Sequence, residues 1–147
     1  MTEANGPLLH VWLAVDQGDG ARFMTDIEQM LVAVATRQDV QISHVAPPSM
    51  WPASPQHVFL RVLRGSAAVF LAELGMHRGQ LIPHDSTIGR VFTSTVGVEV
   101  LEAGATPSTG KPGGAVAIKT YNYVQRRATR HSTGRTVSLD AMLAGAE

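Results

Sequence analysis

The chain has 147 residues, with twelve basic and twelve acidic side chains, no cysteine and a hydrophobic content of 44%. This length corresponds to one domain, and the apolar content is sufficient for a core, which excludes wholesale disorder. The lack of cysteine excludes disulfides and thiolate metal sites. No apolar run is long enough for a membrane helix and residues 1–7 lack the features of a signal peptide, so we expect a cytoplasmic protein with no membrane partner.

The charges are distributed unevenly along the chain. Residues 1–110 carry six Lys/Arg and ten Asp/Glu, a net charge of −4, whereas residues 111–147 carry six Lys/Arg and two Asp/Glu, a net charge of +4. A basic end on an acidic body favours contact of one face with a polyanion. The alternative is that these arginines only solvate a surface strand.

The first part of the chain predicts strands around one helix. Residues 8–15, 40–45 and 57–64 are short apolar or alternating runs that are typical of strands. A helix is predicted at 22–37 by an apolar stripe at helical spacing, which consists of Phe23, Ile27, Met30, Leu31 and Val34. We expect Asp19 to cap this helix. The four prolines of the segment that precedes the third strand exclude regular structure at 47–55.

The middle of the chain predicts a short helix followed by two strands. Ser66 is expected to cap a helix that extends through Glu73. Two strands are expected at 76–82 and 91–101, and the second alternates valine with glycine and glutamate. A polar loop at 83–90 joins these two strands.

The last part of the chain begins with a linker at 103–115, which is rich in glycine and proline. A strand is expected at 116–123, and a short helix is expected to begin at Asp140 with Ser138 as its cap. The order of the predicted elements mixes hairpin and crossover connections. It therefore predicts an α+β fold, in which a mixed or antiparallel sheet has its helices packed on one face.

No constellation of residues predicts catalysis or a metal site. The six histidines lack the spacing of metal ligands. His84, Asp85 and Ser86 are the residue types of a catalytic triad, but neighbours in sequence cannot form its line of hydrogen bonds. The glycine-rich residues 110–114 lack the Lys-Ser/Thr pair of a phosphate-binding loop. We therefore expect no metal ion, no other cofactor and no enzymatic activity.

Two separated motifs resemble a known family. Residues 75–83 (Gly-Met-His-Arg-Gly-Gln-Leu-Ile-Pro) and 89–95 (Gly-Arg-Val-Phe-Thr-Ser-Thr) resemble the decoding domain of bacterial class I peptide-chain release factors. Those proteins carry Gly-Val-His-Arg-Val-Gln-Arg-Val-Pro, a loop of the same length, then Gly-Arg, an apolar residue and His-Thr-Ser. Residues 118–127 (Ile-Lys-Thr-Tyr-Asn-Tyr-Val-Gln-Arg-Arg) are similar to the family's Ile-Arg-Thr-Tyr-Asn-Phe-Pro-Gln-x-Arg. The resemblance spans residues 8–145.

The resemblance implies a release factor reduced to its decoding part. In the family, a domain that bears a catalytic Gly-Gly-Gln tripeptide lies between the two motifs, and a helical domain precedes them. Here residues 103–115 alone occupy the place of the catalytic domain. We therefore expect a codon-recognition domain at 1–102, a linker at 103–115, and a C-terminal segment at 116–147 that packs on the first domain.

The resemblance also implies a surface that binds the ribosome. The residues expected to face the codon are Pro83, His84, Asp85, Ser86, Arg90, Phe92, Thr93 and Ser94, and those expected to contact ribosomal RNA are Lys119, Arg126, Arg127, Arg130 and Arg135. Asp85 and Phe92 depart from the family's Pro-x-Thr and His-Thr-Ser. A carboxylate only accepts hydrogen bonds, and a phenyl ring stacks without discriminating among bases, so we expect weakened stop-codon specificity.

The leading hypothesis is a non-catalytic module that binds the decoding centre of the small ribosomal subunit. Its partners would be the ribosomal RNA and the messenger codon in the A site, and its role would be to modulate termination, rescue or ribosome idling. One alternative is a peptide-release or rescue activity whose hydrolytic domain is supplied by a partner protein. Another alternative is a protein-binding adaptor that has kept the fold and lost RNA binding.

Overall fold

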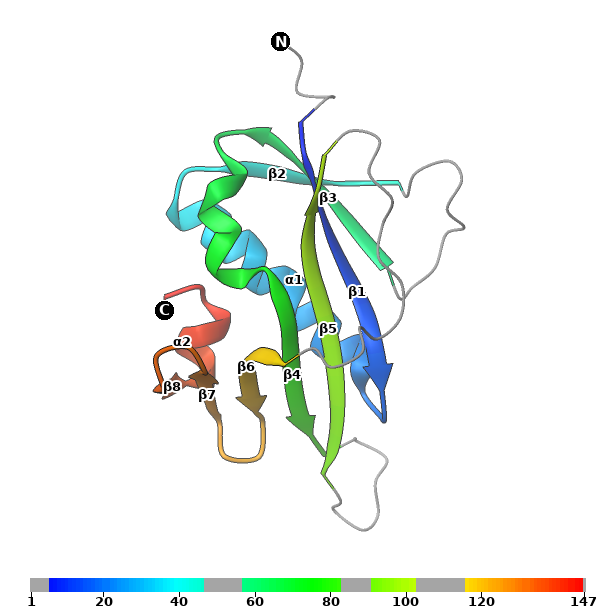
Figure 1. Cartoon of the computed structure of the whole chain (residues 1–147), viewed down its shortest axis with the longest axis vertical. Coiled ribbons are helices and arrows are strands. Elements are labelled where there is room, and N and C mark those ends of the chain that lie inside the picture. The colour runs from blue at the N-terminus through cyan, green and yellow to red at the C-terminus, as the bar shows by residue number, and fades with distance from the viewer. Residues whose placement is uncertain (1–5, 47–56, 83–90, 103–115, 147) are drawn as a thin grey trace.

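The computed structural model describes residues 6–46, 57–82, 91–102 and 116–146. Within these ranges the chain forms eight strands, two α-helices and one 3₁₀ helix (Figure 1). The strands are β1 (Leu8–Asp16), β2 (Gln41–Val45), β3 (His57–Arg64), β4 (Gly75–Leu81), β5 (Phe92–Leu101), β6 (Ala117–Asn122), β7 (Arg127–Arg130) and β8 (Arg135–Ser138). The helical elements are α1 (Gly20–Arg37), the 3₁₀ helix η2 (Ala67–Glu73) and α2 (Leu139–Leu143).

All eight strands belong to one sheet, in the order β2-β3-β1-β5-β4-β6-β7-β8. Neighbouring strands are antiparallel except β4 and β6, which are parallel. Residues 116–146 therefore extend the sheet that the earlier strands build. The mixed sheet with its few helices confirms the predicted α+β class.

The core lies between the helices and one face of the sheet (Figure 1). The predicted helical stripe is confirmed, since the buried residues of α1 include Phe23, Ile27, Met30, Leu31 and Val34. These side chains belong to one buried cluster that also contains Phe70 of η2, Leu139 of α2 and residues of β1, β3, β4 and β5. Helix α1 contacts β1, β5, η2 and α2. One face of the sheet is thus covered by the helices and is called here the helix face.

Strand β4 approaches α1 closely because it carries a glycine at the contact. A Cβ atom on Gly79 would lie 2.8 Å from the ring of Phe23, which is too close for any side chain. The ring therefore rests on the backbone of β4. This contact fixes the position of the strand that carries the first motif.

The turn before α1 differs from the prediction. Asp19 adopts a left-handed conformation (φ 57°) and its side chain makes no capping hydrogen bond. Asp16 takes this role, because its Oδ1 accepts hydrogen bonds from the backbone N–H groups of Gly18 (2.9 Å) and Gly20 (3.1 Å). The expected cap at Asp19 is wrong because its left-handed backbone departs from the extended conformation that a capping side chain requires.

The remaining elements agree with the prediction except in two places. The caps are confirmed, since the hydroxyls of Ser66 and Ser138 accept hydrogen bonds from the N–H groups of the residues two and three positions later. The first short helix is a 3₁₀ helix, and the basic stretch after β6 forms the hairpin β7–β8, which was not predicted. The predicted segments 47–55, 83–90 and 103–115 lie outside the described residues. No helix within the described ranges is long and apolar enough to cross a membrane.

Candidate functional site

The two motifs meet as neighbouring parallel strands, β4 and β6. In their register His77 lies beside Lys119 and Gly79 lies beside Tyr121. Because side chains alternate across a strand, these four residues point to the helix face. The residues between and after them on the two strands, Arg78, Gln80, Thr120 and Asn122, point to the opposite face, which is called here the open face. Each motif therefore contributes to two different environments.

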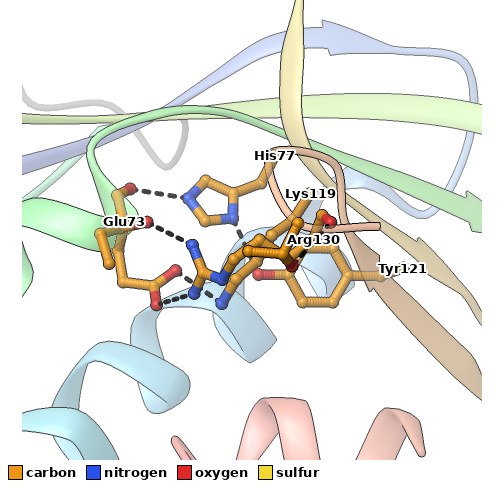
Figure 2. A network of polar contacts seen from close by, with 7 residues as sticks. Glu73, His77, Lys119, Tyr121 and Arg130 are labelled. Atoms are coloured by element: carbon orange, nitrogen blue, oxygen red, sulfur yellow. Dashed lines mark hydrogen bonds and ion pairs between the residues drawn. The ribbon is translucent and has the colours of Figure 1, made fainter. Parts of the chain in front are cut away.

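On the helix face, a buried carboxylate joins two cations (Figure 2). Glu73, at the end of η2, has a side chain that is 4% exposed. Its Oε1 lies 2.7 Å from the Nζ of Lys119, and its Oε2 lies 2.9 Å from the Nη2 of Arg130. Arg130 also donates through Nη1 to the backbone oxygen of Ala72 at 2.8 Å. One carboxylate thus ties η2 to both β6 and β7.

His77 completes this network as a neutral ring. Its Nε2 lies 2.8 Å from the backbone oxygen of Glu73, which can only accept, so Nε2 carries the proton. Its Nδ1 lies 2.8 Å from the hydroxyl of Tyr121 and therefore accepts from that hydroxyl. Figure 2 shows the imidazole held between these two partners. A second proton would place a positive charge on a fully buried ring close to Lys119 and Arg130, so the surroundings favour the neutral form.

The pKa values follow the same geometry. Burial lowers the pKa of His77 to about 4, against the opposing effect of the Glu73 backbone oxygen and carboxylate. Burial, together with the charge of Glu73, raises the pKa of the Tyr121 hydroxyl well above its usual value. The hydroxyl therefore stays protonated and continues to donate to His77. The charged members of the network are Glu73, Lys119 and Arg130.

The structure corrects the expectation that Lys119 contacts ribosomal RNA. Its side chain is 1% exposed and its ammonium is paired with Glu73, so a surface phosphate cannot reach it. Arg130 is 12% exposed and directs its guanidinium to the same carboxylate. The other three residues of this group, Arg126, Arg127 and Arg135, are exposed, as the hypothesis requires.

The residues expected to face the codon are only partly described. Pro83, His84, Asp85, Ser86 and Arg90 lie outside the described residues. The structure shows the strand that follows them, in which Phe92 pairs with Leu81 on β4.

Within that strand, side chains alternate between the two faces of the sheet. Phe92 is half-buried on the helix face, and Thr93 lies on the open face opposite Gln80. Ser94 is fully buried, and its hydroxyl donates to the backbone oxygen of Gly18 at 3.3 Å. The expectation that Ser94 faces the codon is therefore corrected, because this hydroxyl binds the turn before α1.

On the open face, the motifs line a shallow polar cleft of about 320 Å³. Its lining residues, called here the polar cleft, are Arg78, Gln80, Thr120, Asn122, Gln125, Arg127, Thr129, His131 and Thr136. Of these, the sequence hypothesis singled out Arg127 alone. The signal that could have found Arg78, Gln80, Thr120 and Asn122 is the alternation along the strand in each motif, which places every second residue on one face.

Hydrogen bonds order the floor of the polar cleft. The guanidinium of Arg78 donates to the hydroxyl of Thr120 from Nε (3.2 Å) and Nη2 (3.0 Å), and the same hydroxyl lies 2.7 Å from Nε2 of His131. The hydroxyls of Thr129 and Thr136 lie 2.8 Å apart on neighbouring strands. The described residues include no group of three or more His, Asp or Glu that could hold a metal ion.

The comparisons with known proteins show the fold. The structure matches RF2, a release factor, of Thermus thermophilus with a TM-score of 0.71 and 15% sequence identity. The match covers 96% of this chain but 64% of that structure. No family model and no curated protein matches the sequence. The chain therefore has a release-factor-like fold and spans less than two thirds of the length of the release factor that it matches.

The buried network predicts a large effect of removing its carboxylate. Glu73→Gln removes the carboxylate that is paired with the buried Lys119 and the largely covered Arg130, so we expect it to destabilise the protein by about 3–5 kcal/mol in urea unfolding. Lys119→Met leaves Glu73 and Arg130 as a neutral pair and should cost less.

The matched control is the exposed ion pair between Asp140 and Arg126, in which Asp140 is 82% exposed. Asp140→Asn should cost less than about 1 kcal/mol, because solvent screens such a pair. A Glu73→Gln variant no less stable than Asp140→Asn would show that the buried pairs contribute little.

His77 predicts a dependence of stability on pH. Below about pH 6.5, His77 is protonated in the unfolded chain. In the folded protein its ring stays neutral until the pH falls to about 4. The free energy of unfolding should therefore decrease as the pH falls through this window, by an amount on the order of 3 kcal/mol. Urea unfolding between pH 7.5 and 4 measures it. His77→Gln should flatten the decrease of the free energy of unfolding with falling pH, and the exposed control His131→Gln should not. Equal pH dependence of the free energy of unfolding in the wild type and both variants would contradict the assignment of this effect to His77.

Proposed function

We propose that this chain is a non-catalytic, release-factor-like module that binds the decoding centre of the small ribosomal subunit. The single observation that supports this most strongly is that two motifs resembling those of release factors lie side by side in a release-factor-like fold. A chance resemblance of two short segments would not be expected to bring them together as neighbouring strands. The role of such a module is to modulate termination, rescue or ribosome idling.

The charge distribution supports an RNA partner. The net charge of residues 111–147 is +4, with six Lys/Arg against two Asp/Glu, and Arg126, Arg127 and Arg135 are exposed on the strands and turn of that segment. Such groups neutralise phosphates and release counterions, which supplies much of the affinity of proteins for nucleic acids. The proposed partners are ribosomal RNA and the codon in the A site.

The proposal excludes hydrolysis of peptidyl-tRNA by this chain alone. Release factors use a Gly-Gly-Gln tripeptide on a separate domain, and this sequence has no Gly-Gly-Gln. Residues 103–115, which stand in place of that domain, are too few to form one. The chain would occupy the A site without promoting peptide release.

Ribosome binding with strong salt dependence is the expected outcome of this proposal. Neutralisation of about four phosphates implies that affinity falls on the order of fiftyfold between 50 and 200 mM salt. Co-sedimentation with ribosomes that carry a stop or a sense codon in the A site measures the affinity, and a parallel assay measures release of formyl-methionine.

Binding without release is the predicted result for both codons. A chain that stays in the supernatant at low salt would favour the protein-binding adaptor. Codon-dependent release at the rate of an intact factor would contradict the non-catalytic role. Release that appears only after a second protein is added would favour the alternative in which a partner supplies the hydrolytic domain.

A further inference from the structure

Two arginines of the polar cleft have neutral side chains as their hydrogen-bond partners. Within the described ranges, the basic side chains paired with a carboxylate are Arg22, Arg64, Lys119, Arg126 and Arg130. Arg78 and Arg127 have no carboxylate partner there; they donate instead to the neutral side chains of Thr120 and Gln125. Their positive charge is thus not compensated by the described protein, and both line the same cleft.

Most N–H donors of these two guanidiniums have no described acceptor and can bind a ligand. A guanidinium has five N–H groups. Arg78 uses one at Nε and one at Nη2 for the hydroxyl of Thr120, and three are left without a described acceptor. Arg127 uses one at Nη2 for the side-chain oxygen of Gln125, and four are left. The two hydrogen bonds to Thr120 also hold the plane of the Arg78 guanidinium in one orientation, which favours a ligand that accepts several hydrogen bonds at once.

The rest of the cleft predicts the chemical class of that ligand. Its lining contains no carboxylate and no Phe, Tyr or Trp; beside the two arginines it has one histidine, three amides and three threonines. Because no carboxylate lines the cleft to repel it, an anion is the favoured ligand. The absence of Phe, Tyr and Trp from this lining disfavours the extensive stacking of bases that single-strand binding sites use for base contacts. Amides and hydroxyls suit the sugar hydroxyl and the phosphate oxygens, the groups that position a nucleic acid without reading its sequence.

We propose that the polar cleft binds the sugar–phosphate backbone of RNA, with Arg78 and Arg127 bound to phosphate oxygens. The amides of Gln80, Asn122 and Gln125 lie around the two arginines, where they can bind the 2′-hydroxyl. The inference rests on the proposed function, since ribosomal RNA is the partner proposed there. The inference places the main contact with RNA on the open face of β4, β6, β7 and β8 and not on the turn that carries Arg126.

The test compares two double variants that remove the same charge. Arg78→Gln with Arg127→Gln changes the cleft, whereas Arg22→Gln with Arg64→Gln changes two exposed arginines that are already paired with carboxylates. Fluorescence anisotropy with a labelled oligouridine probe measures RNA affinity across a salt series. The cleft variant should lose about tenfold or more in affinity, and its slope of log affinity against log salt should be shallower by about 1.4, the value for two phosphates on a single strand. The control should change less than about threefold.

A second pair of variants keeps the test decisive if the cleft variant does not fold. Thr136→Glu places a carboxylate in the cleft on the exposed edge strand β8, and Thr133→Glu places one in the preceding turn, outside the cleft. Thr136→Glu should weaken binding of the probe and Thr133→Glu should not. Equal effects of the two substitutions would overturn the assignment of the cleft.

The experiments distinguish a wrong assignment of the RNA site to the cleft from a wrong proposed function. If the wild-type chain binds ribosomes and both double variants bind them equally well, the cleft is not the RNA site and the proposed function stands. If the wild-type chain binds the oligouridine through the cleft but does not co-sediment with ribosomes, the cleft stands and the proposed function does not. Binding of an acidic peptide in the cleft, without binding of RNA, would overturn the inference.

Discussion

The structure depends on one buried carboxylate that neutralises two cations beneath the sheet. His77, Lys119 and Arg130 are register neighbours on β4, β6 and β7 and all point to the helix face. Two of them are charged, and without a counter-charge their burial would cost several kcal/mol for each ion. Glu73 supplies that charge from the end of η2. The position of η2 and the attachment of the C-terminal strands are therefore parts of one electrostatic arrangement.

This arrangement explains how one pair of motifs serves two purposes. The residues of β4 and β6 that point to the helix face hold the C-terminal segment on the sheet, and the residues that alternate with them form the polar cleft. Because Tyr121 and Lys119 fix β6 beside β4, the hydroxyl of Thr120 is held where it orients Arg78. A rigid strand pair positions a binding surface better than a loop would.

Elements with a clear period could be predicted from the sequence, and so could the serine caps. The helical stripe of α1 and the alternation in β5 are local patterns. The burial of Lys119 was not predictable from its neighbours, because it depends on Glu73, which is distant in sequence. Ser94 was misassigned for the same reason, since its partner is the turn at Gly18. The hairpin β7–β8 was missed because its strands are four residues long and mostly polar.

A cryo-EM reconstruction of the chain bound to ribosomes tests the central claim most directly, because it shows both the binding site and the face that makes contact. The account predicts density for the chain in the A site of the small subunit, with the open face of β4, β6, β7 and β8 against ribosomal RNA and Arg78 and Arg127 at its phosphates. Density at another site, or a chain that presents α1 and α2 to the RNA with the polar cleft in solvent, would contradict it.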